Sequence, residues 1–191
     1  HRHDTGSRMV RCDNCGHFYM KDRLRAEDLH LLYTDEYFSA EYEKFNEGVS
    51  SDYLKDKDGI MTFVKRRWGE ILDHSPAGKK FLDIGCAYGF YLEEGRKLGF
   101  EVEGLELCDD AVRHCKEQGF KVDQRPVELC DFAAESFHVI GLWLVLEHFL
   151  DPAKVMAKIS SWLSPQGLIS IKIPTVDGIT FRLTPDIWWQ Q

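Results

Sequence analysis

The residues best suited to chemistry lie in a short segment from Asp83 to Gly89, which reads Asp-Ile-Gly-Cys-Ala-Tyr-Gly. An apolar run leads into it, so the segment predicts the end of a buried strand, a glycine turn and the start of a helix. Glycine lets a backbone approach a ligand that a side chain would exclude. Glu106, at the end of a second apolar run, can accept hydrogen bonds from two ribose hydroxyls. Together these residues predict a pocket for a nucleoside-like cofactor.

The glycine spacing distinguishes two classes of cofactor. A dinucleotide fingerprint, Gly-x-Gly-x-x-Gly, requires two more glycines after Gly85, where the chain has Ala87 and Phe90. This spacing disfavours the alternative of an NAD-dependent oxidoreductase. The pattern Asp-x-Gly-x-x-x-Gly resembles the first motif of class I S-adenosylmethionine-dependent methyltransferases, and Glu106 resembles their second. The resemblance covers residues 30–175 and implies a three-layer, Rossmann-like α/β fold whose mostly parallel sheet binds S-adenosylmethionine across its strand ends.

The resemblance also implies roles for individual residues. Asp83 would orient the glycine turn or meet the amino group of the cofactor, and Glu106 would bind the ribose. Leu107 would pack on the adenine. The loop at residues 124–127 would border the adenine, mostly through backbone groups; the alternative is that this loop only connects two elements. The cofactor-binding residues implied in this way are Tyr37, Asp83, Gly85, Cys86, Ala87, Tyr88, Gly89, Glu106, Leu107, Pro126, Val127, Trp143 and Leu144.

The segment Val145–Phe149 follows the fourth expected strand and therefore lies at the mouth of the pocket. Related methyltransferases carry a Glu-His pair here that faces the active site, so Glu147 and His148 are the catalytic candidates. Histidine can accept a proton near neutral pH; a histidine that caps the following loop is the alternative. A similar subgroup, the ubiquinone-pathway O-methyltransferases, holds a divalent metal with Glu-x-x-Glu-His. Leu144 stands where the first Glu would be, which argues against a metal-assisted mechanism.

Cys12 and Cys15 form a Cys-x-x-Cys-Gly segment that resembles one knuckle of a zinc ribbon. Structural zinc takes four ligands, and only two cysteines are present here. His1, His3 and His17 could complete a site, although no spacing rule selects them. Bound zinc and a metal-free pair are both open interpretations, whereas a redox pair is disfavoured because no strand-to-helix start surrounds it.

Composition narrows the kind of protein. The chain has 191 residues, 43% of them hydrophobic, which suits one α/β domain with a small appendage. A formal charge of -8 disfavours nucleic acid as the main partner, because phosphate binding relies on Lys and Arg. No apolar run approaches the roughly 20 residues of a membrane span, and the N-terminus lacks signal-peptide character. The remaining cysteines lack framework spacing, as is typical of reduced thiols in a cytoplasmic protein.

Three zones are expected along the chain: a zinc-ribbon-like segment at residues 1–25, a helical lid at 26–75 and a cofactor-binding core at 76–191. Strand and helix signals alternate in the core, which predicts a parallel sheet of five strands. The expected elements after the first strand are a helix at 88–98, a strand at 101–106, a helix ending at 118, a strand at 120–122, a strand at 137–144, a helix from Pro152, a turn at 164–167 and a strand at 168–173.

The lid carries an apolar stripe at helical spacing, which predicts a buried face formed by Ile60, Phe63, Val64, Trp68, Ile71 and Leu72. The resemblance implies that a lid tyrosine, Tyr37 or Tyr42, touches the carboxylate of the cofactor. An aromatic face that packs on the sheet is the alternative.

The resembling family has seven strands, whereas 17 residues follow Pro174. We therefore expect the C-terminal strands to be truncated or remodelled. The expected acceptor is a small molecule, and nothing in the sequence indicates an oligomeric state. A non-catalytic cofactor-binding module is a second alternative, because an intact pocket without turnover would carry the same residues.

Overall fold

The computed structural model describes residues 9–21 and 53–174. Its contacts divide the chain into two compact units, His1–Leu32 and Tyr33–Gln191. The expected tyrosine contact of the lid and the expected C-terminal truncation both fall outside the described residues. Within the described ranges, no helix combines the length and the apolarity that crossing a membrane requires.

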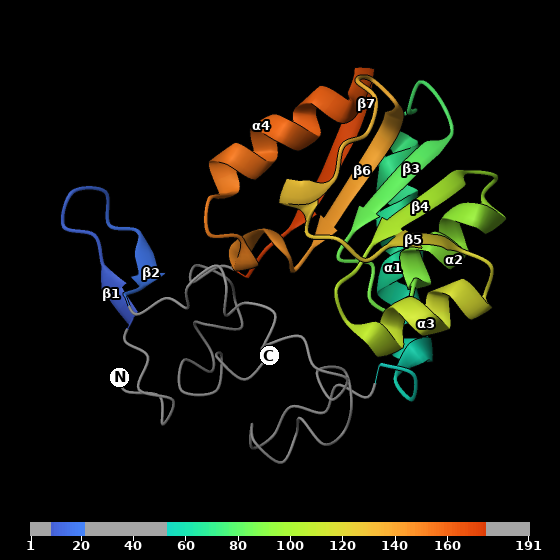
Figure 1. Cartoon of the computed structure of the whole chain (residues 1–191), viewed down its shortest axis with the longest axis horizontal. Coiled ribbons are helices and arrows are strands. Elements are labelled where there is room, and N and C mark those ends of the chain that lie inside the picture. The colour runs from blue at the N-terminus through green and yellow to red at the C-terminus, as the bar shows by residue number, and fades with distance from the viewer. Residues whose placement is uncertain (1–8, 22–52, 175–191) are drawn as a thin grey trace. The chain divides into compact units, whose positions relative to one another are not determined.

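The first unit contains a β-hairpin, drawn in blue in Figure 1, in which β1 (Met9–Arg11) runs antiparallel to β2 (Phe18–Met20). The Cys12 N–H group donates to the His17 carbonyl at 2.7 Å, and the Gly16 N–H group donates to the Cys12 carbonyl at 2.9 Å. Gly16 takes a φ of +74°, which glycine adopts at little cost. These contacts close a tight turn around the cysteine pair.

The second unit is built on a parallel sheet with the order β5-β4-β3-β6-β7 (Figure 1). Its strands are β3 (Lys80–Ile84), β4 (Glu101–Leu105), β5 (Lys121–Asp123), β6 (Phe137–Trp143) and β7 (Leu163–Lys172). Along the chain, β4 and β5 are added on one side of β3, and β6 and β7 are then added on its other side. Ligands of open α/β sheets bind at the carboxyl edge beside such a reversal. The prediction of a Rossmann-like parallel sheet is confirmed.

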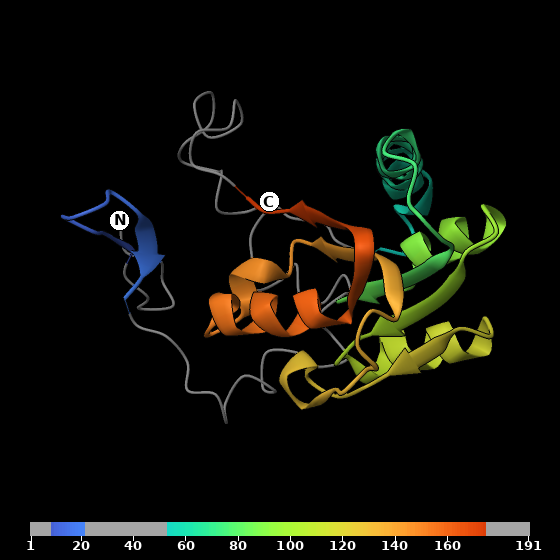
Figure 2. The ribbon, with the colours of Figure 1, turned by 90° about the horizontal axis from the view of Figure 1, so that it is seen from above.

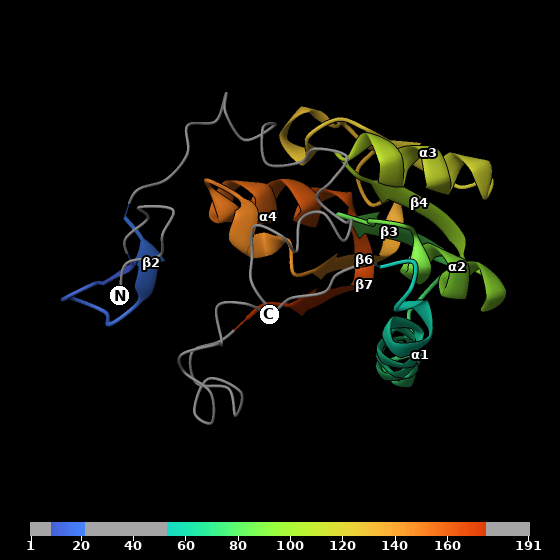
Figure 3. The same cartoon turned by 90° about the horizontal axis from the view of Figure 1, so that it is seen from below.

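Helices cover both faces of this sheet, with 3-10 turns in two of the loops. They are α1 (Lys57–Asp73), α2 (Phe90–Lys97), α3 (Asp109–Glu117), η4 (Val127–Leu129), η5 (Leu146–His148) and α4 (Pro152–Trp162). Successive strand residues point to opposite faces, so Phe81 belongs to the core cluster that includes residues of α1, α2 and α3, and Leu82 to the cluster that includes residues of η4 and α4. Figures 2 and 3 show α1 and α4 on opposite sides of the sheet. The expected three layers are therefore present.

Local signals explain the helix ends. The Asp151 carboxylate accepts a hydrogen bond from the Lys154 N–H group at 3.0 Å, and Pro152 occupies the first turn of α4. Gly99 and Gly119, with φ of +82° and +74°, follow α2 and α3. A left-handed glycine in this position satisfies the last helical carbonyls and stops the helix.

The buried face of α1 differs from the predicted stripe at Phe63 and at Met61. Met61, Val64, Trp68 and Ile71 are buried, whereas Phe63 is 65% exposed. Met61 lies one turn before Val64 and therefore fills the core side of the helix. Phe63 lies about 100° further around the helix from Val64, and its ring points outward.

The predicted turn before the last strand, Ser164–Gly167, lies inside β7 instead. Two steps along β6, from Phe137 to Val139, correspond to five steps along β7, from Leu163 to Leu168. Pairing with β6 begins before Ser164–Gly167 and resumes after it. These residues therefore form a bulge within β7 and do not pair with β6.

Candidate functional site

The loop after β3 forms a tight turn at the carboxyl edge of the sheet. Gly85 and Gly89 take φ values of +74° and +75°, a conformation that glycine accommodates without strain. The N–H groups of Gly85 and Cys86 both donate to the Leu105 carbonyl, at 2.8 and 3.0 Å. These bonds tie the glycine turn to the end of β4.

Glu106 follows β4 directly, and its side chain is buried beneath the glycine turn. One carboxylate oxygen, Oε2, accepts a hydrogen bond from the Ala87 N–H group at 2.8 Å. The other, Oε1, accepts from the N–H groups of Leu107 at 2.7 Å and Cys108 at 2.9 Å. Burial raises the pKa of Glu106, and these three N–H donors oppose the rise. Glu106, the residue expected to bind the ribose, therefore connects the glycine turn to the start of α3.

Asp83 lies on β3 between Gly104 of β4 and Gly141 of β6. Its side chain is 1% exposed, and neither carboxylate oxygen has a hydrogen-bond partner among the described residues. Burial raises the pKa of Asp83 well above its ordinary value, with smaller effects from Cys115 and Glu106. A buried carboxyl of this kind requires a proton, a donor or a cationic partner.

The glycine turn touches the loop after β6. A Cβ added at Gly85 would lie 2.3 Å from Cγ2 of Val145, so both the backbone conformation and the available space require glycine there. In the same loop, Leu144 is exposed and takes a φ of +58°, while its N–H group donates to the Lys172 carbonyl at 2.8 Å. Left-handed backbone at a residue other than glycine is strained, and such strain clusters at functional sites.

Glu147 and His148 lie in η5, directly after this loop, and both reach the surface. Desolvation by the surrounding protein nevertheless raises the pKa of Glu147 and lowers the pKa of His148. The lowered pKa keeps the imidazole neutral near pH 7, which is the form that accepts a proton. The His148 N–H group donates to the Val145 carbonyl at 3.0 Å, which orders the turn.

Two aromatic residues expected at the site direct their side chains inward. The Trp143 ring stacks on Tyr91 with ring centroids 3.5 Å apart and 8° between the planes. It occupies the space that a side chain at Gly141 would need. The Tyr88 hydroxyl donates to the Asp110 carboxylate at 2.7 Å and so ties the glycine turn to α3.

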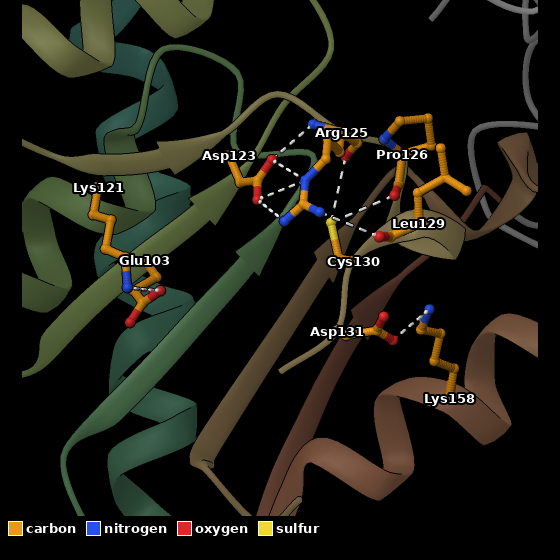
Figure 4. Close-up of polar contacts among 9 residues, drawn as sticks. All are labelled: Glu103, Lys121, Asp123, Arg125, Pro126, Leu129, Cys130, Asp131 and Lys158. Carbon is orange, nitrogen blue, oxygen red and sulfur yellow. Dashed lines mark hydrogen bonds and ion pairs between the residues drawn. The ribbon is translucent and has the colours of Figure 1, made fainter. Parts of the chain in front are cut away.

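The loop after β5 is held by an ion pair and by a thiol (Figure 4). The Arg125 guanidinium binds the Asp123 carboxylate, with Nη2 2.6 Å from Oδ2. The Cys130 thiol donates to the Pro126 carbonyl at 3.4 Å. Pro126 is exposed, whereas Val127 is buried in the core that includes α4. The two residues expected beside the adenine therefore face different environments.

Two tyrosines near Asp83 and Glu106 were not expected from the sequence. Tyr53 precedes α1 and packs against the core, where burial and the charge of Glu106 raise its pKa. Tyr91, on α2, has its pKa raised by burial and next by Asp83. Neither tyrosine stands in a recognisable pattern, because Tyr53 lies in a polar turn and Tyr91 follows the glycine motif.

The cysteine pair of the hairpin offers two sulfur ligands. The backbone N–H groups of Cys15 and Asn14, and then the Cys15 thiol, lower the pKa of Cys12. Over residues 9–21 and 53–174, no group of three or more His, Cys, Asp or Glu side chains could hold a metal ion. Two cysteines alone are fewer than the four ligands that structural zinc takes.

Residues 56–191 match a protein family described as a methyltransferase domain. The chain belongs to this family. The match includes α1, the whole parallel sheet and every loop at its carboxyl edge. It confirms the resemblance to class I S-adenosylmethionine-dependent methyltransferases that the glycine turn and Glu106 first indicated.

Curated relatives of this methyltransferase domain are ubiquinone biosynthesis O-methyltransferases. The protein of Methylococcus capsulatus is 32% identical over 148 residues, which cover 71% of this chain and 62% of the relative. The protein of Thiobacillus denitrificans is 36% identical over 100 residues, which cover 49% of this chain and 43% of the relative. The chain therefore spans less than two thirds of the length of these relatives.

Solved structures share the fold of the methyltransferase domain. An S-adenosylmethionine-dependent methyltransferase from Archaeoglobus fulgidus aligns with a TM-score of 0.56 and 21% identity, over 70% of this chain and 64% of that one. The plantazolicin methyltransferase BpumL, in complex with SAH, aligns with a TM-score of 0.56 and 18% identity, over 76% of this chain and 59% of that one. At these identities the likeness establishes the fold.

Proposed function

We propose that the protein binds S-adenosylmethionine and transfers its methyl group to a hydroxyl of a small-molecule acceptor. The observation that carries this proposal is the buried Asp83 carboxyl, without a partner in the described residues, beneath a glycine turn that is bonded to Glu106. The family match, the O-methyltransferase names of the relatives and the SAH in the BpumL structure support it.

In this proposal the two carboxyl groups bind different parts of the methyl donor. Asp83 pairs with the amino group of the methionine portion, which supplies the cation that this buried carboxyl needs. Glu106 keeps Oε1 on the N–H groups of Leu107 and Cys108 and uses Oε2, beside Ala87, for the ribose hydroxyls. Leu107 then lies next to the adenine.

Catalysis in this proposal is mainly positioning, with His148 as the base. The donor supplies a methyl carbon on a positively charged sulfur, and the carbon–sulfur bond breaks as the acceptor oxygen attacks. His148 takes the hydroxyl proton, because its lowered pKa leaves the imidazole neutral. Glu147 is the second candidate for this proton. Leu144 offers no oxygen ligand, so the proposal uses no metal at this turn.

Calorimetric titration with S-adenosylmethionine, S-adenosylhomocysteine and NAD tests the donor site. We expect Glu106→Ala to weaken binding of the first two about tenfold to hundredfold, the effect of a lost charged hydrogen bond. The matched control is Glu103→Ala, which removes a carboxylate from β4, the strand that precedes Glu106, where Glu103 pairs with Lys121 at 2.7 Å (Figure 4). Binding of NAD alone would overturn the proposal, and unchanged affinity in Glu106→Ala would remove its ribose role.

A methyl-transfer assay with labelled donor and a panel of small hydroxyl compounds tests turnover. Transfer by the parent and its loss in His148→Asn, with donor affinity retained, would support the assigned base. Tight donor binding without any transfer would favour the alternative of a non-catalytic cofactor-binding module.

We also propose that the hairpin binds zinc through Cys12 and Cys15. The lowered pKa of Cys12 favours the thiolate, which is the form that ligates metal. The two further ligands would come from outside the described residues, where the chain has His1 and His3. Metal analysis of protein purified without chelator should find about one zinc per chain, lost in the double variant Cys12→Ser, Cys15→Ser. Parent protein free of zinc would end this proposal.

A further inference from the structure

Two buried thiols beneath the glycine turn have no role in the steps above. Cys86 belongs to the turn itself and Cys115 lies on α3, with exposed fractions of 5% and 0%. The Cys115 thiol donates to the Ala87 carbonyl at 3.3 Å, and the Cys86 thiol donates to the same oxygen at 3.8 Å. Cys115 is therefore the closer donor to this carbonyl, and Cys86, which has a single proton, is close both to the carbonyl and to the Cys115 thiol.

The surroundings hold these sulfur atoms in place. A Cβ added at Gly89 would lie 2.9 Å from Sγ of Cys115, and one added at Gly104 would lie 2.7 Å from Sγ of Cys86. The two glycines thus leave space that the sulfur atoms fill. A hydrogen bond with Cys115, together with burial, raises the pKa of Cys86 well above its ordinary value. Cys86 consequently remains a protonated thiol, able to donate, at neutral pH.

Ala87 is the residue on which these contacts act. It takes a φ of +46°, which is unfavourable for a residue with a Cβ. Its N–H group donates to Glu106, and its carbonyl accepts from the Cys115 thiol. The C=O and N–H groups of a trans peptide point in opposite directions. A carbonyl held toward α3 therefore turns the Tyr88 N–H group to the opposite side.

We propose that Cys115, assisted by Cys86, is a positioning residue of the methyl-donor site, because its thiol sets the orientation of the Ala87–Tyr88 peptide. The proposal rests on the proposed function, since it concerns the turn that would contact the donor. A similar arrangement occurs in the loop after β5, where the Cys130 thiol donates to the Pro126 carbonyl (Figure 4).

The test compares four variants by two measurements. Cys115→Ala removes the donor and Cys115→Ser keeps one. Val112→Ala removes a similar amount of buried core from the same helix, since Val112 is 3% exposed. Cys130→Ala removes the donor of the other loop. The measurements are amide hydrogen exchange over residues 85–89 without ligand and the calorimetric Kd for S-adenosylhomocysteine.

We expect Cys115→Ala to speed exchange in the turn and to weaken S-adenosylhomocysteine binding about threefold to tenfold. Cys115→Ser should restore both, Val112→Ala should leave both near the parent, and Cys130→Ala should leave exchange at 85–89 unchanged. Exchange in Cys115→Ala that matches the parent, or an equal effect of Val112→Ala, would overturn the proposal. A parent that binds no S-adenosylhomocysteine would instead overturn the proposed function, and exchange would still decide the role of Cys115.

Discussion

Replacing Asp83 with asparagine should separate the stability of the ligand-free protein from its affinity for the methyl donor. Asparagine has nearly the same shape as aspartate and carries no charge. Neither Asp83 oxygen has a hydrogen-bond partner among the described residues, so the change removes no contact identified there. We expect Asp83→Asn to be more stable than the parent at pH 8 without ligand, and to bind S-adenosylmethionine more weakly.

The sign and size of the stability effect follow from the raised pKa of Asp83. Between its ordinary value of 3.8 and its raised value, the folded protein holds a proton that the unfolded chain has released. In this window the parent's free energy of unfolding falls as pH rises, by up to about 1.4 kcal/mol per pH unit. Asparagine does not titrate, so two pH units inside the window separate the two proteins by about 2.7 kcal/mol.

Urea unfolding of both ligand-free proteins from about pH 4.5 to about pH 8 measures this difference. Titrating groups that do not interact with Asp83 cancel when one free energy is subtracted from the other, and Glu106, whose charge acts on Asp83, adds a smaller contribution. The control is Asp73→Asn, which makes the same substitution at an exposed carboxyl at the end of α1. A difference between the Asp83 variant and the parent that is constant with pH, or a parent that is the more stable protein at pH 8, would refute the reasoning.

Three further predictions address the loops. Gly85→Ala should lower the free energy of unfolding by more than the roughly 1–2 kcal/mol of a left-handed alanine, because it also displaces Val145. Urea unfolding compares it with Gly99→Ala, since Gly99 has a φ of +82° and open space around it. Equal losses of stability in the two variants would contradict the contact with Val145. His148→Asn should lower kcat about 10²–10⁴-fold. In the parent, kcat/KM should fall at acid pH, below pH 6.5, as His148 becomes protonated, and a pH profile of the variant should lack this fall. Chelator should leave the methyl-transfer rate unchanged because Leu144 offers no ligand oxygen; a rate restored by Mg²⁺ would oppose this.

Much of the core was predictable because its signals are local. Apolar runs separated by glycine or proline mark β3, β4 and β6, and Asp151 with Pro152 marks the start of α4. The glycine turn and Glu106 could be placed at one edge because parallel strands end together. These features depend on a few neighbouring residues, which a sequence displays directly.

Other features depend on contacts that a sequence does not display. The exposure of Phe63 depends on which side of α1 meets the sheet, and the bulge in β7 depends on its pairing with β6. The inward turn of the Trp143 ring requires Gly141 on the same strand. The convergence of Cys115 on the Ala87 carbonyl joins residues that are 28 positions apart, without any repeat or motif to signal it.

The contact between Gly85 and Val145 has a consequence for the proposed methyl transfer. Gly85 lies in the turn assigned to the donor, and Val145 leads into the turn that carries His148. With no space between them, a displacement of one turn is transmitted to the other. We expect the two sites to be coupled, so that bound S-adenosylhomocysteine changes the affinity for the acceptor and bound acceptor changes the affinity for S-adenosylhomocysteine by the same factor.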